Sequence, residues 1–391
     1  MAIQQPETPY LQIIRRTLWL LLAVTLLAGC EKTEERAGLT TTQDEVVLRS
    51  TAGSEAAFTV SSTEAWSLTT TGSGFDVSPT RGGRGETTVT VRAQDDNTGH
   101  SRIKLGTVML NLTAGGAQCS VTVSQSPATA TQTMLYMPGR DLLNFYKQNI
   151  DGVLKAVDAN VPGDGRILVC YQPNTHSQAE MYEAYFNAEK QAAAFTLLKS
   201  YDDFAAADPA CVQRMLSDVA ALAPAQHYGI IVGCHGKAWV PADHGALSYS
   251  ARMTNELEDL WIPMPGALLT RSFGDTGRSI DITNFAAAVK AQNYRPDYLL
   301  FDACFMANIE TLYDLRECTD YVIAAPCEIM AQGFPYERAM PWFFTDGGKE
   351  YNLTKVCEAF WNFYMNDATT KSGCISLAVM AEMEGMKEMS G

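Results

Sequence analysis

The sequence predicts a multidomain chain in which an N-terminal all-β sandwich precedes an α/β domain with a mostly parallel sheet flanked by helices. Three observations predict it. At 391 residues the chain is too long for one ordinary domain. Residues 43–126 contain short Thr/Val-rich runs that alternate polar and apolar residues, as half-buried strands do. Further along, continuous apolar runs alternate with helical stretches, which is typical of strands covered on both faces.

Residues 1–30 are typical of a targeting segment and stand outside the fold. Two arginines precede the apolar run TLWLLLAVTLLAGC, which is too short for a transmembrane helix. Its end, residues 27–30, resembles a bacterial lipobox. This resemblance implies cleavage before Cys30, a lipid on its sulfur, and an exported lipoprotein at the outer membrane or cell surface. A buried N-terminal helix is the alternative, and the polar residues 31–42 are the expected tether.

The charge and cysteine content narrow the class of protein. The net charge is −15 and no long Lys/Arg run is present, which excludes a nucleic-acid footprint and favours a cationic substrate. Of the ten cysteines, Cys30 is assigned to the lipid, so an odd number remains and at least one thiol is free. Without CxxC pairs, we expect unpaired and mostly buried thiols.

The β segment, residues 43–126, has the strand spacing of a sandwich. Its expected strands are EVVLRS, AAFTVSS, AWSLTTT, FDVSPT, TTVTVRAQ, LGTVMLNLT and CSVTVSQ. Trp66 in EAWSL, the stretch SPTRGGRGETTVTV and the closing VTVSQSP resemble the BACON family, immunoglobulin-like modules of gut-bacterial surface proteins. The resemblance implies contact with glycan or mucin. The alternative is a spacer that holds the next domain away from the membrane.

Residues 127–132 are the expected linker, and residues 133–391 are the expected α/β domain. Its strand candidates are TMLYMPG, RILVCYQP, FTLLKSY, HYGIIVGC, YLLFDAC, YVIAAPC and CISLAVM. Its helix candidates are 141–157, 208–223, 283–293, 308–316 and 352–366.

Two of these strands end on chemically active side chains. His235 follows HYGIIVGC, and Cys304 follows YLLFDA. Since open α/β sheets bind ligands at the carboxyl ends of their strands, the two side chains can meet there if the strands are neighbours. A thiol beside an imidazole is the minimum apparatus for nucleophilic catalysis.

The neighbours of this pair fit the same chemistry. Gly236 lets the backbone approach a substrate, and its N–H with that of Cys304 can bind an oxyanion. Asp302 lies two residues before Cys304, so both side chains point to one side of the strand, where a carboxylate selects a cationic group.

The blocks HYGIIVGCHGKAW and YLLFDACFMANIETLYDLRECTDYVIAAPCEIMAQGFPY resemble the clostripain-like cysteine peptidases, relatives of caspases, legumain and gingipains. The resemblance runs from about residue 133 to the end and includes GRSIDITNFAAAVKA. It implies a caspase-like fold, a dyad of His235 and Cys304, and cleavage of protein or peptide substrates after Arg or Lys, with Asp302 in the specificity pocket. Trp239 and residues 333–336 match further positions near the site. Some relatives require Ca²⁺, so calcium is the one cofactor that the resemblance raises.

The sequence departs from the family pattern in two places. Lys237-Ala238 replaces the small residues that usually follow His-Gly, and Pro326-Cys327-Glu328 replaces Ser-Gln-Glu. Both changes bear on substrate preference more than on chemistry. Relatives usually continue beyond the position of CISLAVM, so we expect the sequence to be incomplete at its C-terminus.

A long stretch with little regular pattern separates His235 from the helix expected near residue 283. Such a stretch exceeds the usual connections in a compact domain and is normally functional. Several relatives are activated by self-cleavage after a basic residue here, which implies a cut after Arg252 or Arg271. The alternative is an ordered loop or pocket wall, and His244 belongs to the same loop.

Two other functions compete with the peptidase. One is a thiolate-rich metal site, which would combine Cys170, Cys234 and Cys327 with the dyad, but nothing in the spacing fixes tetrahedral geometry, so no metal is expected. The other is a catalytically silent surface lipoprotein that binds glycan or protein through its β-sandwich. The presence of both dyad residues and of Asp302 favours the active enzyme.

Overall fold

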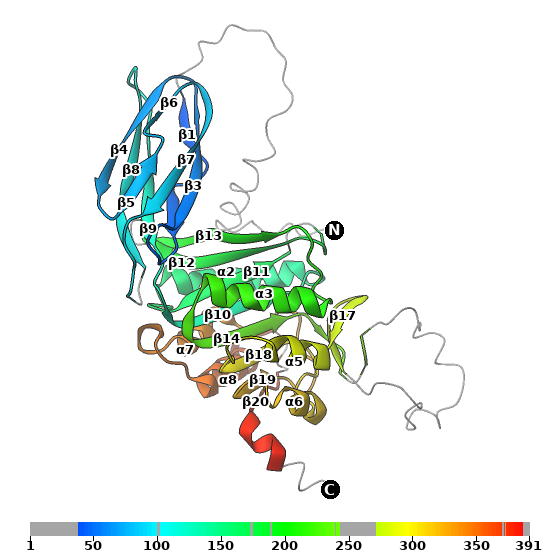
Figure 1. Ribbon diagram of the computed structural model, residues 1–391. Coiled ribbons are helices and arrows are strands. Elements are labelled where there is room, and N and C mark those ends of the chain that lie inside the picture. The colour runs from blue at the N-terminus through cyan, green and yellow to red at the C-terminus, as the bar shows by residue number, and fades with distance from the viewer. Residues whose placement is uncertain are drawn as a thin grey trace.

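Figure 1 shows the computed structural model of the chain. Cys30, Trp239 and Arg252 lie outside the residues that it describes. Those residues are 38–99, 102–172, 175–187, 190–238, 240–242, 271–369, 371 and 373–385. No helix among them is long and apolar enough to cross a membrane.

Two sheets form the N-terminal part of the described chain, drawn in blue and cyan in Figure 1. One sheet has the order β1-β3-β7-β5 and the other β2-β9-β8-β4-β6. The strands are β1 (Leu39–Thr41), β2 (Glu45–Leu48), β3 (Glu55–Ser62), β4 (Trp66–Gly72), β5 (Phe75–Ser78), β6 (Arg81–Gly82), β7 (Gly85–Ala93), β8 (Ile103–Leu112) and β9 (Gln118–Gln125).

The core between these sheets follows from strand alternation. In β8 every second residue from Gly106 to Leu112 is buried, which turns one side of the strand inward. Trp66 is buried at the centre of the cluster. Gly82 lies flat on its indole, because a Cβ at this position would come within 2.6 Å of the ring. The packing of Trp66 therefore requires a glycine at position 82 of the stretch SPTRGGRGETTVTV.

The remaining chain forms an eight-stranded sheet with the order β13-β12-β11-β10-β14-β18-β19-β20. The run from β11 to β19 is parallel, and β12, β13 and β20 are antiparallel. The strands are β10 (Ala130–Pro138), β11 (Arg166–Tyr171), β12 (Ala179–Asn187), β13 (Ala192–Tyr201), β14 (Ala225–Gly233), β18 (Tyr298–Asp302), β19 (Tyr321–Ala324) and β20 (Ser376–Val379). The prediction of an α/β domain with a mostly parallel sheet is confirmed.

Helices cover both faces of this sheet, as Figure 1 shows. Helices α3, α5 and α6 pack on one face, and α2, α7 and α8 pack on the other. Alternate residues of β14 supply the two faces, since Ile230 and Val232 belong to one cluster and Ile231 to the other. The helices are α2 (Leu143–Asp158), α3 (Pro209–Leu222), α5 (Ile282–Lys290), α6 (Ile309–Leu315), α7 (Tyr336–Phe343) and α8 (Leu353–Asn362), with short helical turns at Asp346–Gly348, Phe363–Asp367 and Met380–Glu382.

Several features differ from the sequence-based expectation. Strand β1, Leu39–Thr41, pairs with β3 and so belongs to the sandwich, although residues 31–42 were expected to be a tether. Strand β10 begins at Ala130, so the last three residues of the expected linker 127–132 belong to the strand. Strand β12 and helix α7 were not expected. The first is rich in polar residues, and the second contains Pro341, which normally interrupts a helix.

The β-sandwich is fixed to the α/β domain by a buried ion cluster on β12. Arg166 donates two hydrogen bonds to the Glu183 carboxylate, at 2.9 and 2.8 Å. Arg102, which precedes β8 of the sandwich, forms an ion pair with the same carboxylate at 2.7 Å and lies over the ring of Tyr185. Burial favours the neutral form of Glu183, but the two arginines outweigh it and lower its pKa to about 2.

A second contact lies beside this cluster. Asn187 donates a 2.9 Å hydrogen bond to Glu45 of β2, and the Tyr185 hydroxyl donates to the same carboxylate. The two domains therefore share buried charges and do not meet only through the chain that links them.

We predict that Glu183→Gln lowers the free energy of unfolding at pH 7 by about 3–5 kcal/mol, because it leaves two buried arginines without a counter-charge. The stabilisation from Glu183 is complete above its unfolded pKa of 4.5 and is lost as the pH falls through about 2. Urea denaturation of the wild type and of Glu183→Gln from pH 7 to pH 3 should therefore show that the difference between their free energies of unfolding becomes smaller as the pH falls. The matched control is Glu358→Gln, which removes an exposed ion pair with Lys355 and should change stability by less than about 1 kcal/mol. Equal, small effects of the two substitutions would contradict the interpretation.

Candidate active site

The pairing of β14 with β18 brings His235 and Cys304 to the same level of the sheet. The two strands are parallel neighbours, and their last paired residues are Gly233 and Asp302. His235 and Cys304 each follow two residues later. A hydrogen bond of 3.3 Å from the Cys234 N–H to the Asp302 carbonyl extends the contact beyond the last pair. The carboxyl ends of both strands thus deliver an imidazole and a thiol to one edge.

Gly236 fixes how closely the two strand ends approach. A Cβ at this position would lie 1.8 Å from the carbonyl oxygen of Cys304, so no other residue fits without moving the backbone. His235 and Gly236 form the short strand β15, which pairs with β16 (Ser272–Asp275), and β16 pairs with β17 (Arg278–Asp281). This hairpin holds the histidine segment against the backbone of the nucleophile candidate.

The Cys304 thiol is partly buried and held by one loop. The Ile329 N–H donates to Sγ at 3.3 Å. Burial raises the pKa of Cys304, and the nearby charges of Glu328 and Asp302 raise it further, whereas the Ile329 N–H lowers it. The thiol is therefore protonated at neutral pH and needs a base to become a nucleophile. Phe305, the next residue, has a φ of 60°, a conformation that only special surroundings hold in a non-glycine residue.

Asp302 is a buried carboxylate, only 4% exposed. Its Oδ2 accepts hydrogen bonds from the Phe334 N–H at 3.2 Å and from the Tyr336 hydroxyl at 3.0 Å. Gly333 lies directly against it, since a Cβ there would be 2.6 Å from Oδ2. Burial raises the pKa of Asp302 to about 6, although both hydrogen bonds oppose the rise. Residues 333–336, expected near the site, thus enclose this carboxylate.

Two further carboxylates lie beside His235, and the sequence reasoning missed them. The backbone N–H groups of Arg140 and Asp141 donate to Asp275, at 3.0 and 3.1 Å. Slight burial opposes ionisation of Asp141, but hydrogen bonds from Thr276 and the charges of His235 and His176 lower its pKa. Asp141 follows β10, the other neighbour of β14, so a rule that lists every polar residue after a central strand would have found it.

The same residues are the metal-ligand cluster of the described chain. Ligand atoms of Asp141, His176 and Asp275 lie within 4.8 Å of one another. Ca²⁺ takes about six to eight oxygen ligands, whereas this cluster offers two carboxylates and an imidazole. The oxygens of Asp275 already accept backbone N–H groups. The donor set therefore does not fit the calcium that the family resemblance raised.

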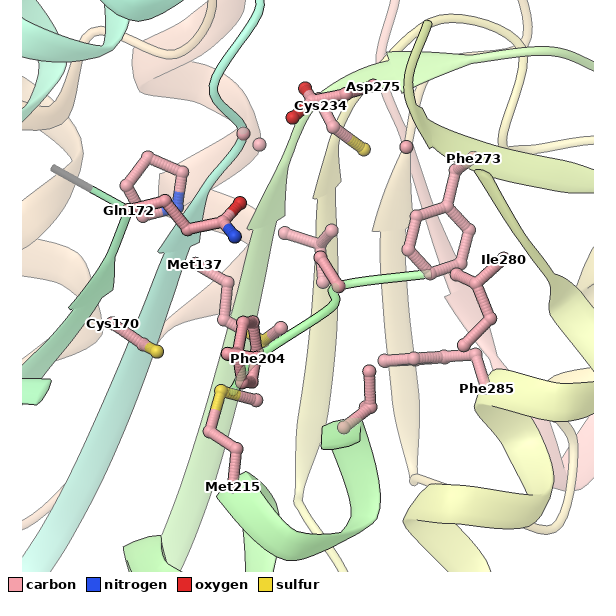
Figure 2. A pocket seen from close by; sticks show the side chains of 17 residues that line it. Met137, Cys170, Gln172, Phe204, Met215, Cys234, Phe273, Asp275, Ile280 and Phe285 are labelled. Carbon is pink, nitrogen blue, oxygen red and sulfur yellow. The ribbon is translucent and has the colours of Figure 1, made fainter. Parts of the chain in front are cut away.

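A cavity of about 60 Å³ lies on the other face of the sheet, beneath α3 and α5. Figure 2 shows Cys234 and Asp275 at one end, with Met137, Phe204, Met215, Phe273 and Phe285 around it. Cys234 is buried, and burial raises its pKa well above the ordinary value. The competing thiol next to His235 is thus turned into an apolar interior. Within the described chain, the thiols of Cys170, Cys234 and Cys327 form no metal-ligand cluster.

Lys237 follows β15 and Arg271 precedes β16, so the two residues flank this strand pair. The Lys237 N–H donates to the Ser272 carbonyl at 3.0 Å, which continues the β15–β16 pairing. Arg271 has a 13% exposed side chain and forms an ion pair with Asp314 at 2.9 Å. Its neighbours in the expected loop, Arg252 and Trp239, lie outside the described residues.

The comparisons with known proteins agree with this geometry. Residues 270–388 match the model of the clostripain family, a range that includes Asp302 and Cys304. A secreted C11 cysteine protease from Bacteroides thetaiotaomicron, iotapain, is 27% identical, with 68% of this chain and 71% of that chain covered and a TM-score of 0.57. No curated protein matches significantly.

Two other solved structures share the fold. One is an inactive zymogen C11 protease from Parabacteroides distasonis, at 24% identity, 67% and 65% coverage and a TM-score of 0.52. The other is a secreted C11 cysteine protease from Bacteroides thetaiotaomicron in complex with an irreversible peptide inhibitor, at 21% identity, 66% and 68% coverage and a TM-score of 0.50. Together with the strand-end geometry, these matches support a clostripain-like cysteine endopeptidase.

Proposed function

We propose that this chain cleaves peptide bonds after Arg or Lys, with Cys304 as the nucleophile and His235 as the general base and acid. The observation that carries the proposal is the β14–β18 register, which ends both strands level, together with the contact of Gly236 on the Cys304 backbone. His235 is partly exposed, and the partly buried Cys304 thiol accepts a hydrogen bond from the Ile329 N–H.

The protonated resting thiol defines the role of His235. As Sγ attacks the carbonyl carbon of the scissile bond, the imidazole takes the thiol proton and then gives it to the leaving amine. The N–H groups of Gly236 and Cys304 would bind the oxyanion of the tetrahedral intermediate. Water then hydrolyses the thioester and restores the thiol, with His235 as the base in that half of the reaction.

Substrate preference is assigned to the buried carboxylate. An Arg or Lys side chain that reaches Asp302 would replace part of its lost hydration with a charge-assisted hydrogen bond. Glu328, exposed and next to Ile329, adds negative charge at the mouth of the site. Trp239 is proposed as a further substrate contact. The net charge of −15 favours a cationic substrate over the whole molecule.

The proposed location is outside the cell. Iotapain is described as secreted, and residues 27–30 have the lipobox pattern, so we propose a lipid on Cys30 that anchors the protein at the outer membrane or cell surface. Contact of the β-sandwich with glycan or mucin is retained as a proposal. The shared ion cluster at Glu183 supports a fixed position of the sandwich beside the peptidase.

We predict that the 31–391 chain hydrolyses fluorogenic peptides ending in Arg or Lys much faster than matched peptides ending in Leu. Cys304→Ala and His235→Ala should each lower kcat/KM by at least about 10³-fold, as removal of a nucleophile or its base does elsewhere. The matched control is Cys211→Ser, a partly exposed thiol on α3 that should leave the rate unchanged. Absence of cleavage of every peptide, with and without calcium, would instead support a catalytically silent binding protein.

Asp302→Asn should abolish the preference for basic residues. We expect kcat/KM for the Arg peptide to fall by at least about 10²-fold, a loss typical of an unpaired buried charge at a binding site, while the Leu peptide changes little. In the wild type, kcat/KM for the Arg peptide should decline as the pH falls through about 6, because Asp302 is then protonated. The Asn variant should lack this decline. If Asp302→Asn keeps both the preference for the Arg peptide and the decline of kcat/KM near pH 6, another carboxylate must bind the basic side chain.

The same substitution makes a separate prediction on stability. The pKa of Asp302 rises on folding, from 3.8 to about 6, so its ionisation opposes folding as the pH rises through this range. Asp302→Asn keeps an acceptor for Phe334 and Tyr336 and removes the buried charge. Its free energy of unfolding should exceed that of the wild type by up to about 3 kcal/mol at pH 8, with no gain below about pH 4. Urea denaturation at pH 8 and pH 4 measures the difference between the free energies of unfolding of the two proteins. The same difference at both pH values would contradict the prediction.

Self-cleavage after Arg252 or Arg271 is retained as a proposal. The ion pair and low exposure of Arg271 favour Arg252 as the first site. We predict that N-terminal sequencing of purified wild-type protein finds a fragment beginning at Met253, and that Cys304→Ala and Arg252→Gln yield intact chains. Full activity of an uncut wild-type chain would remove self-cleavage as an activation step.

A further inference from the structure

Two exposed cysteines lie side by side near the candidate active site. Strands β19 and β20 are antiparallel, and Ala324 pairs with Ser376 at the end of their contact. The chain that leaves β19 and the chain that enters β20 therefore lie next to each other. Cys327 follows β19 by three residues and Cys374 precedes β20 by two. Both thiols are free and exposed, and the neighbouring Cys374 helps to raise the pKa of Cys327.

The segment that carries Cys327 also holds the loop of the nucleophile. The Phe305 N–H donates to the Cys327 carbonyl at 3.0 Å, and the Ala307 N–H donates to the Ala325 carbonyl at 2.9 Å. Two residues past Cys327, the Ile329 N–H contacts the Cys304 Sγ at 3.3 Å. A shift of Cys327 therefore acts on the backbone directly after Cys304 and on the Cys304 sulfur.

We propose that Cys327 and Cys374 form a thiol modification site, at which a low-molecular-weight disulfide oxidises them to a Cys327–Cys374 disulfide that reversibly slows the peptidase. The slowing rests on the proposed function, whereas the oxidation does not. One protein thiolate attacks the small disulfide, forms a mixed disulfide and releases one small thiol. The second thiolate attacks the protein sulfur of the mixed disulfide and releases the other. The two protein thiols lose two electrons and two protons, which the two small thiols carry away.

The geometry explains why these two cysteines are chosen. A disulfide needs sulfurs about 2.05 Å apart, and the pairing of Ala324 with Ser376 brings the segments that carry the two thiols together. Cys170, Cys234 and Cys318 are buried and closed to an external disulfide. Cys304 is partly buried, and its sulfur is occupied by the Ile329 backbone.

The geometry also gives the direction of the effect. Formation of the bond moves Cys327 toward Cys374, and this movement should strain the hydrogen bond from the Phe305 N–H to the Cys327 carbonyl. That hydrogen bond holds the residue after the nucleophile in its left-handed conformation. Its weakening should displace the Cys304 backbone, which supplies both the nucleophile and an oxyanion donor.

The chemical half of the proposal is tested in the full chain with Cys304→Ala, where no catalytic thiol interferes. The protein is incubated with oxidised glutathione at pH 8 and digested with trypsin without reduction. Cleavage at Arg338 and Lys371 puts the two cysteines on different peptides. We expect mass spectrometry to find these peptides joined, lighter by two hydrogen atoms than their sum, and separated by dithiothreitol.

Matched variants make this result specific. Cys327→Ser and Cys374→Ser should each abolish the joined peptides, and Cys211→Ser should not. Burial and the neighbouring Cys374 raise the pKa of Cys327, so the joined product should form faster as the pH rises from 7 to 9. Separate glutathione adducts on Cys327 and Cys374 without a joined product, or a product that joins either to another cysteine, would overturn the proposal.

The functional half compares wild type with Cys374→Ser, each relative to its own reduced form. Oxidised glutathione can also modify Cys304 directly, so the glutathione adduct on Cys304 is quantified in the same digests. At equal modification of Cys304, the wild type should lose several-fold more activity toward an Arg peptide than Cys374→Ser and should recover it with dithiothreitol. Equal losses would show that the disulfide does not act on the peptidase. A chain that cleaves no peptide in its reduced form would fail the proposed function and leave the mass-spectrometric result to stand on its own.

Discussion

The parallel pairing of β14 with β18 is the constraint on which the active-site geometry depends. Both strands are apolar along their length because helices cover both faces of the sheet, and this burial fixes their register. A shift by one residue would exchange Ile231 for its neighbours between the two cores. The same register ends the strands level and brings His235 and Cys304 to one edge of the sheet. The proposed catalytic arrangement therefore depends on hydrophobic packing, with Gly236 setting the distance between the two backbones.

The two faces of the sheet have different electrostatic roles. The face beneath α3 and α5 is apolar up to the carboxyl edge, where Cys234 is held as an inert thiol beside a small cavity. The opposite face carries Asp302, a carboxylate that folding holds at an energetic disadvantage. A buried carboxylate that accepts only two hydrogen bonds can accept more, and a cationic side chain can donate them. In the proposed function, substrate specificity and reduced stability thus arise from one residue, as is common at functional sites.

Much of this could be predicted from the sequence, because strand runs buried on both faces and the residues that end them are local signals. HYGIIVGC and YLLFDAC predict their strands, and the residues at the ends of these strands predict the site. Strand β12 could not be predicted in the same way, since its Glu183 becomes buried only through Arg166 and a third residue, Arg102, from another domain. Asp275 likewise gains its place through contacts with Arg140, far away in the sequence. Helix α7 persists despite Pro341 because Met340 and Phe343 are buried against α2 and α8.

One expected departure from the family pattern lies directly beside Cys304 in the structure. Pro326-Cys327-Glu328 lies on the segment whose backbone contacts both Phe305 and the sulfur of Cys304. Substitutions here can leave the proposed dyad intact, because the hydrogen bonds to Phe305 and to the Cys304 sulfur involve main-chain atoms of this segment. They can still change the charge and the redox chemistry beside it through Glu328 and Cys327. A loop that supports the proposed nucleophile with its backbone leaves its side chains free to vary, which agrees with the departure from the family pattern expected at Pro326-Cys327-Glu328.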